Sequence, residues 1–154
     1  GFELLEPATA EALDASIASA FETKTGWLGY YWAPTAALGK YPMARLSFGV
    51  THNQVEWENC TAVPGCASPQ KNSYPTSQAF TLVTQEFTEK AASAMDYIRT
   101  RQWSNATING ILAWQEENRA SNRETAEHFL KTHEEVWSKW VLPLVQERVR
   151  TALQ

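Results

Sequence analysis

The chain has 154 residues, of which 44% are hydrophobic and 19% are charged, and its formal net charge at pH 7 is -4. This composition is sufficient for one globular core and excludes an intrinsically disordered chain. The acidic balance, without a cluster of lysine or arginine, argues against nucleic acid or an anionic membrane surface as the partner.

The opening of the chain predicts a strand, a helix and a second strand. Residues 2–5 form a short apolar run that Pro7 ends, which is consistent with a strand. Thr9 can cap a helix whose apolar residues recur every three or four positions, and Gly26 stops it. An aromatic strand over residues 27–32 follows at once. This order is typical of a crossover unit in a parallel sheet.

Trp32 lies where the aromatic strand turns into a short helix. We expect that helix over residues 34–38, because Pro34 suits the first helical position and Gly39 can close the end. A tryptophan before a helix N-terminus combines an aromatic face, which attracts a cation lacking N–H donors, with backbone N–H groups, which attract a carboxylate. A zwitterion such as a betaine satisfies both, whereas plain core packing of Trp32 is the alternative.

The two tyrosines before Trp32 are not equivalent in a strand. Successive side chains of a strand point to opposite faces, so Tyr30 shares the face of Trp32 and Tyr31 does not. Tyr30 is therefore a second ligand candidate, with core packing as its alternative. The seven tryptophans of the chain do not by themselves identify a site, because most buried tryptophans belong to a core.

The middle of the chain combines strand-like segments with a long loop. Residues 43–50 alternate in a way that predicts a strand with one covered face, and residues 79–84 are also prone to form a strand. Between them, residues 51–74 lose regular periodicity and are rich in Asn, Pro, Gly and Ser. A loop of this length is usually functional or mobile. It contains Trp57, which is a candidate to cover a cleft or a disulfide.

Cys60 and Cys66 enclose a tight Pro-Gly turn that brings them together, which predicts a disulfide and an oxidising compartment. Unlinked thiols are the alternative, and a metal site is disfavoured because no histidine or second cysteine pair stands at ligand spacing. No run approaches the roughly 18 apolar residues of a membrane span, and no basic-then-apolar leader opens the chain. We therefore expect a mature or trimmed form if the protein is exported.

Residues 85–154 predict helices. One helix covers residues 87–98, and a second is opened by Ser104. Ser121 and Glu124 have capping-box spacing, and the helix behind them extends to Trp140. We expect Pro143 to kink or end that helix. Four tryptophans lie at core spacing and are expected to be structural: Trp103, Trp114, Trp137 and Trp140.

Several motifs follow one another along the chain. They are Gly29-Tyr30-Tyr31-Trp32-Ala33-Pro34-Thr35, Gly39-Lys40-Tyr41, Tyr74-Pro75-Thr76-Ser77 and a helical ending with Trp137 and Trp140. In order and separation they resemble the substrate-binding proteins of glycine betaine/choline-type ABC transporters, over nearly the whole chain. The resemblance implies an α/β fold, namely a type II periplasmic-binding-protein-like lobe with a helical C-terminal portion.

The resemblance also implies a division of the chain. Residues 1–84 correspond to the α/β part of the second lobe, and residues 85–154 to a helical segment that returns to pack on the first lobe. The N-terminal lobe, with part of the aromatic cage, has no counterpart in this sequence, so we expect an incomplete fold. Such a chain is a candidate for dimerisation through the surface that the other lobe normally covers.

Site residues follow from the resemblance position by position. Trp32 occupies the family's aromatic position before the proline-initiated helix, and Tyr74 matches a second aromatic region that lines the cleft. The cysteine-containing loop departs from the shortest members of the family. The ligand-binding candidates are Tyr30, Trp32, Ala33, Thr35, Trp57 and Tyr74.

The implied function is solute capture for an ABC importer of glycine betaine or a related quaternary amine. Its partners are the small amine and an ABC permease subunit, its location is periplasmic or extracytoplasmic, and it needs no cofactor. The sequence offers no arrangement of nucleophile, base and acid that indicates an enzyme. The alternatives are a small secreted ligand-sensing or enzymatic domain on the same lobe, and a structural interaction domain whose aromatic excess mediates assembly.

Overall fold

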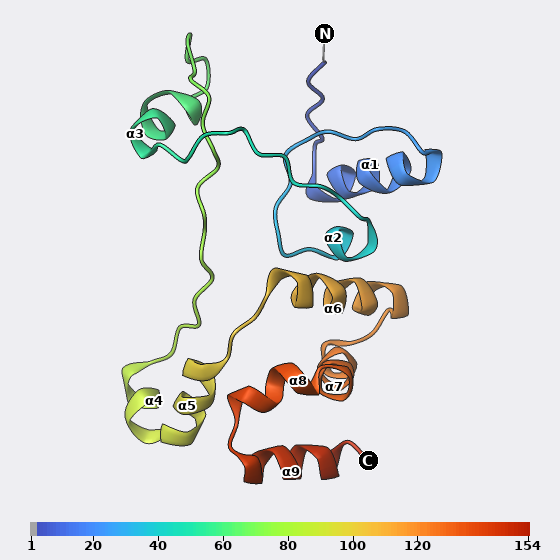
Figure 1. The fold of residues 1–154 in the computed structure, drawn as a ribbon, viewed down its shortest axis with the longest axis vertical. Coiled ribbons are helices and arrows are strands. Elements are labelled where there is room, and N and C mark those ends of the chain that lie inside the picture. Colours follow the sequence, from blue (N-terminus) through green and yellow to red (C-terminus); the bar gives the residue numbers. More distant parts are fainter. Residues whose placement is uncertain (1–2) are drawn as a thin grey trace. The chain divides into compact units, whose positions relative to one another are not determined.

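The computed structural model describes residues 3–154, which divide into two compact units. The helical unit comprises the described residues as far as Met43 together with Thr84–Gln154, and the loop unit comprises Ala44–Val83. The helical unit contains α1 (Ala10–Thr23), α2 (Ala36–Lys40), α4 (Gln85–Lys90), α5 (Ala92–Thr100), α6 (Asn105–Asn118), α7 (Asn122–Thr132), α8 (Glu134–Trp137), η2 (Ser138–Trp140) and α9 (Pro143–Ala152) (Figure 1). The loop unit contains α3 (Gln54–Glu56) and the π-helical turn η1 (Trp57–Thr61).

The expected α/β class is wrong, because residues 3–154 contain helices and irregular backbone but no strand. The predicted strands over residues 27–32, 43–50 and 79–84 lie in irregular segments, as do residues 3–5 of the first one; Phe2 lies outside the described residues. The chain is thus not a type II α/β lobe. Alternation of side chains favours extended backbone, but a sheet also requires a neighbouring strand to complete the ladder of hydrogen bonds.

Residues 27–32 are held by α1 instead of by another strand. The Trp27 indole N–H donates to Ser16 Oγ at 3.0 Å, and the Tyr31 hydroxyl donates to Asp14 Oδ1 at 2.5 Å. The helix α1 begins as predicted, with the Thr9 hydroxyl accepting the Ala12 N–H at 3.2 Å. Both side chains, which a strand would also have placed on one face, therefore meet one helix.

The short helix α2 packs closely on α6 within the helical unit (Figure 1). Its N-cap is Thr35, whose hydroxyl accepts the Leu38 N–H at 3.3 Å, so the helix begins later than predicted and Pro34 precedes the cap. Gly39 lies inside α2 rather than closing it. A Cβ at that position would lie 2.7 Å from the Asn109 carbonyl carbon and 2.8 Å from the Ala113 Cβ. The absence of a side chain at Gly39 therefore permits the close approach of α2 to α6.

The C-terminal half is helical, as predicted, but is more divided. Ser104 caps α6 by accepting the Thr107 N–H at 3.0 Å, and Ser121 and Glu124 form the predicted capping box at α7. The expected single helix from residue 121 to 140 is broken at His133, which has φ of -129° and ψ of 43°. Pro143 does not end a helix but begins α9 at its first position, where its missing N–H costs no hydrogen bond.

The core of the helical unit is aromatic. Phe129, Trp137 and Trp140 are buried against one another, and Trp137 donates its indole N–H to the Leu130 carbonyl at 2.7 Å. We call these three buried residues the core cluster. Trp103 packs on Phe129 and Trp140 at 4.8 Å between ring centroids, although 40% of it is exposed. Apolar residues of α6, α7, α8, α9 and the η2–α9 connection surround the cluster: Ile111, Leu130, Val136, Val141 and Val149.

Within Ala44–Val83, polar contacts replace an apolar core. The buried Asn72 amide accepts the Asn53 N–H at 2.8 Å and donates to the Asn53 carbonyl at 3.0 Å. The Glu56 carboxylate accepts the Gln70 N–H at 2.8 Å. Among the helices of residues 3–154, none combines the length and apolar content that crossing a bilayer requires.

Candidate functional site

Three consecutive aromatic residues gather on the surface of the helical unit. The Trp32 ring stacks on Tyr31 at 4.8 Å between centroids, with 30° between the planes, and lies 6.3 Å from the Tyr30 ring. Trp32 is 42% exposed and Tyr30 is 54% exposed, so neither ring is enclosed by the core. We call these residues the surface triad. They present aromatic faces to water, which is the property that binding of a methylated cation requires.

Tyr31 belongs to this group although the sequence reasoning excluded it. Alternation along a strand would have turned Tyr31 away from Trp32, but the backbone is not a strand, and Tyr31 is the nearer of the two tyrosines to Trp32. Partial burial raises the pKa of Tyr31, and its hydrogen bond to Asp14 raises it further, while Thr35 acts in the opposite direction. The carboxylates of Asp14 and Glu116 also raise this pKa by their negative charge.

The backbone after Trp32 offers fewer donors than expected. Pro34 has no N–H, and the Thr35 N–H donates to the Asn109 side-chain oxygen at 2.8 Å. The remaining N–H groups of this stretch are those of Ala33 and Ala36. Thr35 therefore holds α2 in place, because its hydroxyl caps that helix and its N–H donates to Asn109 of α6.

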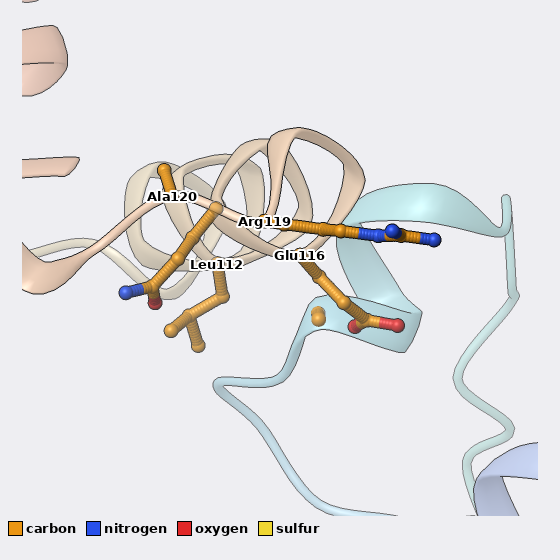
Figure 2. A pocket seen from close by; sticks show the side chains of 6 residues that line it. Leu112, Glu116, Arg119 and Ala120 are labelled. Atoms are coloured by element: carbon orange, nitrogen blue, oxygen red, sulfur yellow. The ribbon is translucent and has the colours of Figure 1, made fainter. Parts of the chain in front are cut away.

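A hollow of about 590 Å³ lies where α2 meets the C-terminal part of α6. Figure 2 shows Leu112 and Glu116 leaving the same side of α6, with Glu116 reaching toward α2. The Glu116 carboxylate forms an ion pair with Lys40 at 2.7 Å, which links the two helices. The Glu116 carboxylate lines this hollow and also raises the pKa of Tyr31 in the surface triad by its negative charge. The lining residues are Ala36, Leu112, Gln115, Glu116, Arg119 and Ala120.

The loop unit has an aromatic pair of its own. The Trp57 and Tyr74 rings meet edge to face at 5.6 Å between centroids, and the His52 ring lies 5.6 Å from Trp57. Trp57 is half-buried and Tyr74 is 49% exposed. The predicted candidates thus fall into two groups. Tyr30, Trp32, Ala33 and Thr35 lie in the helical unit, and Trp57 and Tyr74 in the loop unit.

Hydrogen bonds fix the orientation of His52 beside this pair. Its Nδ1 lies 2.8 Å from the Ser73 carbonyl oxygen, and its Nε2 lies 2.8 Å from Gln54 Oε1. These two contacts, the one with Gln54 being the stronger, raise the pKa of His52. Contacts with two acceptors favour the imidazolium form, in which both ring nitrogens are donors.

A second hollow, of about 200 Å³, lies within the loop unit beside Tyr74. Tyr74 is one of the predicted ligand candidates, whereas Arg45 and Phe48 are not, because residues 43–50 carry only a strand pattern and no motif. The lining residues are Arg45, Leu46, Ser47, Phe48, Ser73 and Tyr74.

The predicted disulfide between Cys60 and Cys66 is present, with 5.3 Å between the Cα atoms. It joins Cys60, which lies within η1, to Cys66 and closes the turn that the sequence indicated. Within residues 3–154, no three side chains of His, Cys, Asp or Glu come together in a group that could hold a metal ion.

One protein family matches the chain. The family described as the substrate binding domain of ABC-type glycine betaine transport system matches residues 1–132. The matched range includes the surface triad, the whole loop unit and the elements through α7. No curated protein matches the chain.

Proposed function

Because this chain belongs to the family of substrate-binding domains of ABC-type glycine betaine transport systems, we propose that it captures glycine betaine or a related quaternary amine on an aromatic surface. Members of this family bind small ligands and work with an ABC permease. The proposed mechanism is equilibrium binding, in which aromatic faces replace water around the methylated ammonium group and no bond of the solute is made or broken.

The observation that carries this proposal is the exposed Trp32 ring. It is supported on one side by Tyr31 and has Tyr30 nearby, so three rings are available in one place. A cation–π contact contributes on the order of 0.5 to 2 kcal/mol, so one ring is insufficient and several must act together. The Asp14 carboxylate, which accepts the hydrogen bond of the Tyr31 hydroxyl, further favours a cation at this position.

The other candidate residues have supporting roles in the proposal. The N–H groups of Ala33 and Ala36 are donors for a polar end of the solute, and Thr35 holds α2 in place. Trp57 and Tyr74 are proposed ligand residues of the loop unit. We also propose an extracytoplasmic, for example periplasmic, location, because the Cys60–Cys66 disulfide is favoured in an oxidising compartment.

The proposal is tested by isothermal titration calorimetry of the full chain with glycine betaine and with choline. We expect Trp32→Ala to weaken binding by about 2- to 30-fold, the equivalent of one cation–π contact. Trp114→Ala is the matched control, because Trp114 is half-buried and stacks on His128 at 3.7 Å between centroids. Equal losses in both variants, at equal folding by circular dichroism, would contradict the assignment.

A further inference from the structure

The loop unit, Ala44–Val83, buries very few of its side chains. Asn72 is the one buried residue of this unit, and the two cysteines are half-buried. Chains of about 40 residues or fewer seldom bury enough apolar surface to fold alone, and they usually need a disulfide, a metal ion or a partner. Within Ala44–Val83, no group of side chains could hold a metal ion. The Cys60–Cys66 disulfide is therefore the constraint on which the fold of this unit can depend.

Hydrogen bonds join residues 50–56 to residues 70–73, and we call this set of contacts the polar clasp. The Asn72 side chain lies at its centre, where it accepts the Asn53 N–H at 2.8 Å and donates to the Asn53 carbonyl at 3.0 Å. The same amide donates to the hydroxyl of Thr61, the residue after the first cysteine, at 3.4 Å. Each such bond replaces a bond to water and so adds only a small net stability. The polar clasp alone therefore gives the unit little resistance to opening.

The disulfide shortens the path between the two sides of the polar clasp. Glu56 accepts the Gln70 N–H across a separation of 14 positions, and the disulfide spans 6 positions within that stretch. A crosslink there removes conformations that the open chain would otherwise have, so closing the clasp costs less entropy. For a ring of this size, the chain-entropy model gives roughly a 50-fold shift toward the folded unit. A unit held mainly by polar contacts is sensitive to a change of that size.

Both cysteines of the chain lie in the loop unit, so reduction acts directly on this unit alone. A thiolate of a dithiol attacks one sulfur of the disulfide and forms a mixed disulfide, and the second thiol of the reductant then displaces the remaining sulfur. Cys60 and Cys66 are left as thiols, two electrons and two protons have been transferred, and the dithiol has become a disulfide. The helical unit has no cysteine, and its core cluster depends on apolar packing that this exchange does not change.

We propose that the loop unit is a redox-dependent folding unit. With the disulfide formed, the polar clasp is closed and the Trp57 and Tyr74 rings meet edge to face. When a dithiol reduces the disulfide, the polar clasp opens and this aromatic pair is lost, while the helical unit stays folded. The redox state of the surroundings thus controls whether the aromatic pair of the loop unit is formed.

Hydrogen exchange of the full chain, followed by ¹⁵N NMR with and without dithiothreitol, tests this proposal. In the oxidised chain the amides of Asn53, Ala62 and Gln70 donate hydrogen bonds and should be protected. On reduction they should exchange about 10- to 50-fold faster. The amides of His133 and Trp137, which donate hydrogen bonds in the helical unit, should change by less than about twofold. No solute is needed, so the result is independent of the proposed function.

Complete reduction is verified by mass after alkylation of the thiols. A change of less than about threefold at the three loop-unit amides would then overturn the proposal. Equal acceleration at the two helical-unit amides would also overturn it, because unfolding would extend beyond the loop unit. The double variant Cys60→Ser, Cys66→Ser should exchange rapidly at the loop-unit amides without reductant. Protection there like that of the oxidised wild-type chain would contradict the proposal as well.

Asn72→Ala tests the polar clasp while the disulfide remains. Because this substitution removes the centre of the clasp, the Asn53 and Gln70 amides should exchange at least about fivefold faster. Asn59→Ala is the matched control, because Asn59 is exposed and its amide donates to the Val55 carbonyl only one turn earlier. It should change the exchange by less than about twofold. Equal effects of the two variants would overturn the proposal that polar contacts and the disulfide together hold this unit.

Discussion

The helical unit contains two sets of three aromatic residues that differ in their use. The core cluster lies on α7, α8 and η2 among apolar side chains, and Trp137 within it is 3% exposed. The surface triad precedes the five-residue helix α2, and Trp32 within it is 42% exposed. The difference shows that enclosure by surrounding helices, not the number of tryptophans, separates a structural ring from one that is available to a ligand.

The largest expected effect is on the free energy of unfolding, which should distinguish the core cluster from the surface triad. Trp137→Ala should lower the free energy of unfolding by about 3 to 5 kcal/mol, because it removes apolar contacts and leaves a cavity. Trp32→Ala should lower it by less than about 1 kcal/mol, because its ring is already largely in water. Urea denaturation followed by circular dichroism measures both values. Similar losses for the two variants would remove the distinction between the sets.

A second test changes the packing of α2 on α6, the helix pair that follows the surface triad. In Gly39→Ala, the new Cβ would meet the Asn109 backbone and the Ala113 side chain, and we expect a loss of about 1 to 3 kcal/mol in the free energy of unfolding. Binding of quaternary amines should weaken as well, because α2 follows the triad directly.

Gly110→Ala is the control for that substitution. Gly110 lies within α6, and a Cβ there would meet nothing within 4 Å. It should therefore increase the free energy of unfolding by about 0.5 to 1 kcal/mol through helix propensity. If both glycine variants were stabilised, the close approach of α2 to α6 would not depend on Gly39.

The smallest effects concern two histidines that lie against tryptophans. NMR titration should find the pKa of His52 above its ordinary value of 6.5, mainly through its contact with Gln54. The pKa of His128, which stacks on Trp114, should lie below that value through desolvation and the charge of His133. A shared midpoint at the ordinary value would contradict both environments.

The two shifts act on stability in opposite directions. The raised pKa of His52 gives a contribution that is complete below about pH 6.5 and is lost as pH rises through the higher folded-state pKa. The lowered pKa of His128 gives a contribution that is present above about pH 6.5 and is lost as pH falls through the folded-state pKa. His52→Ala and His128→Ala should each remove one of these dependences from the pH profile of the unfolding midpoint.

Local chemistry made several features predictable. Thr9, Ser104 and Ser121 cap helices as their spacing indicates, because a cap depends only on residues within one turn. The Cys60–Cys66 disulfide also depends on a short turn, and it was predicted correctly. The order of the motifs predicted the family, and the family match over residues 1–132 confirms it.

Features that depend on distant partners were not predictable in this way. Alternation over residues 27–32 suggested a strand, but pairing requires another strand, and Trp27 and Tyr31 bind α1 instead. The same error turned Tyr31 away from Trp32. Pro143 was expected to stop a helix, but proline suits a first helical position equally well, and its role depends on the break before it.

The hydrogen bond from the Thr35 N–H to Asn109 joins residues that are 74 positions apart. During synthesis, the segment that carries Trp32 is made long before the amide that anchors it. A nascent chain that has grown as far as Lys90 holds all three rings of the triad but none of the helix against which α2 rests. The segment that carries the surface triad therefore gains the support of α6 only after the intervening residues have been made.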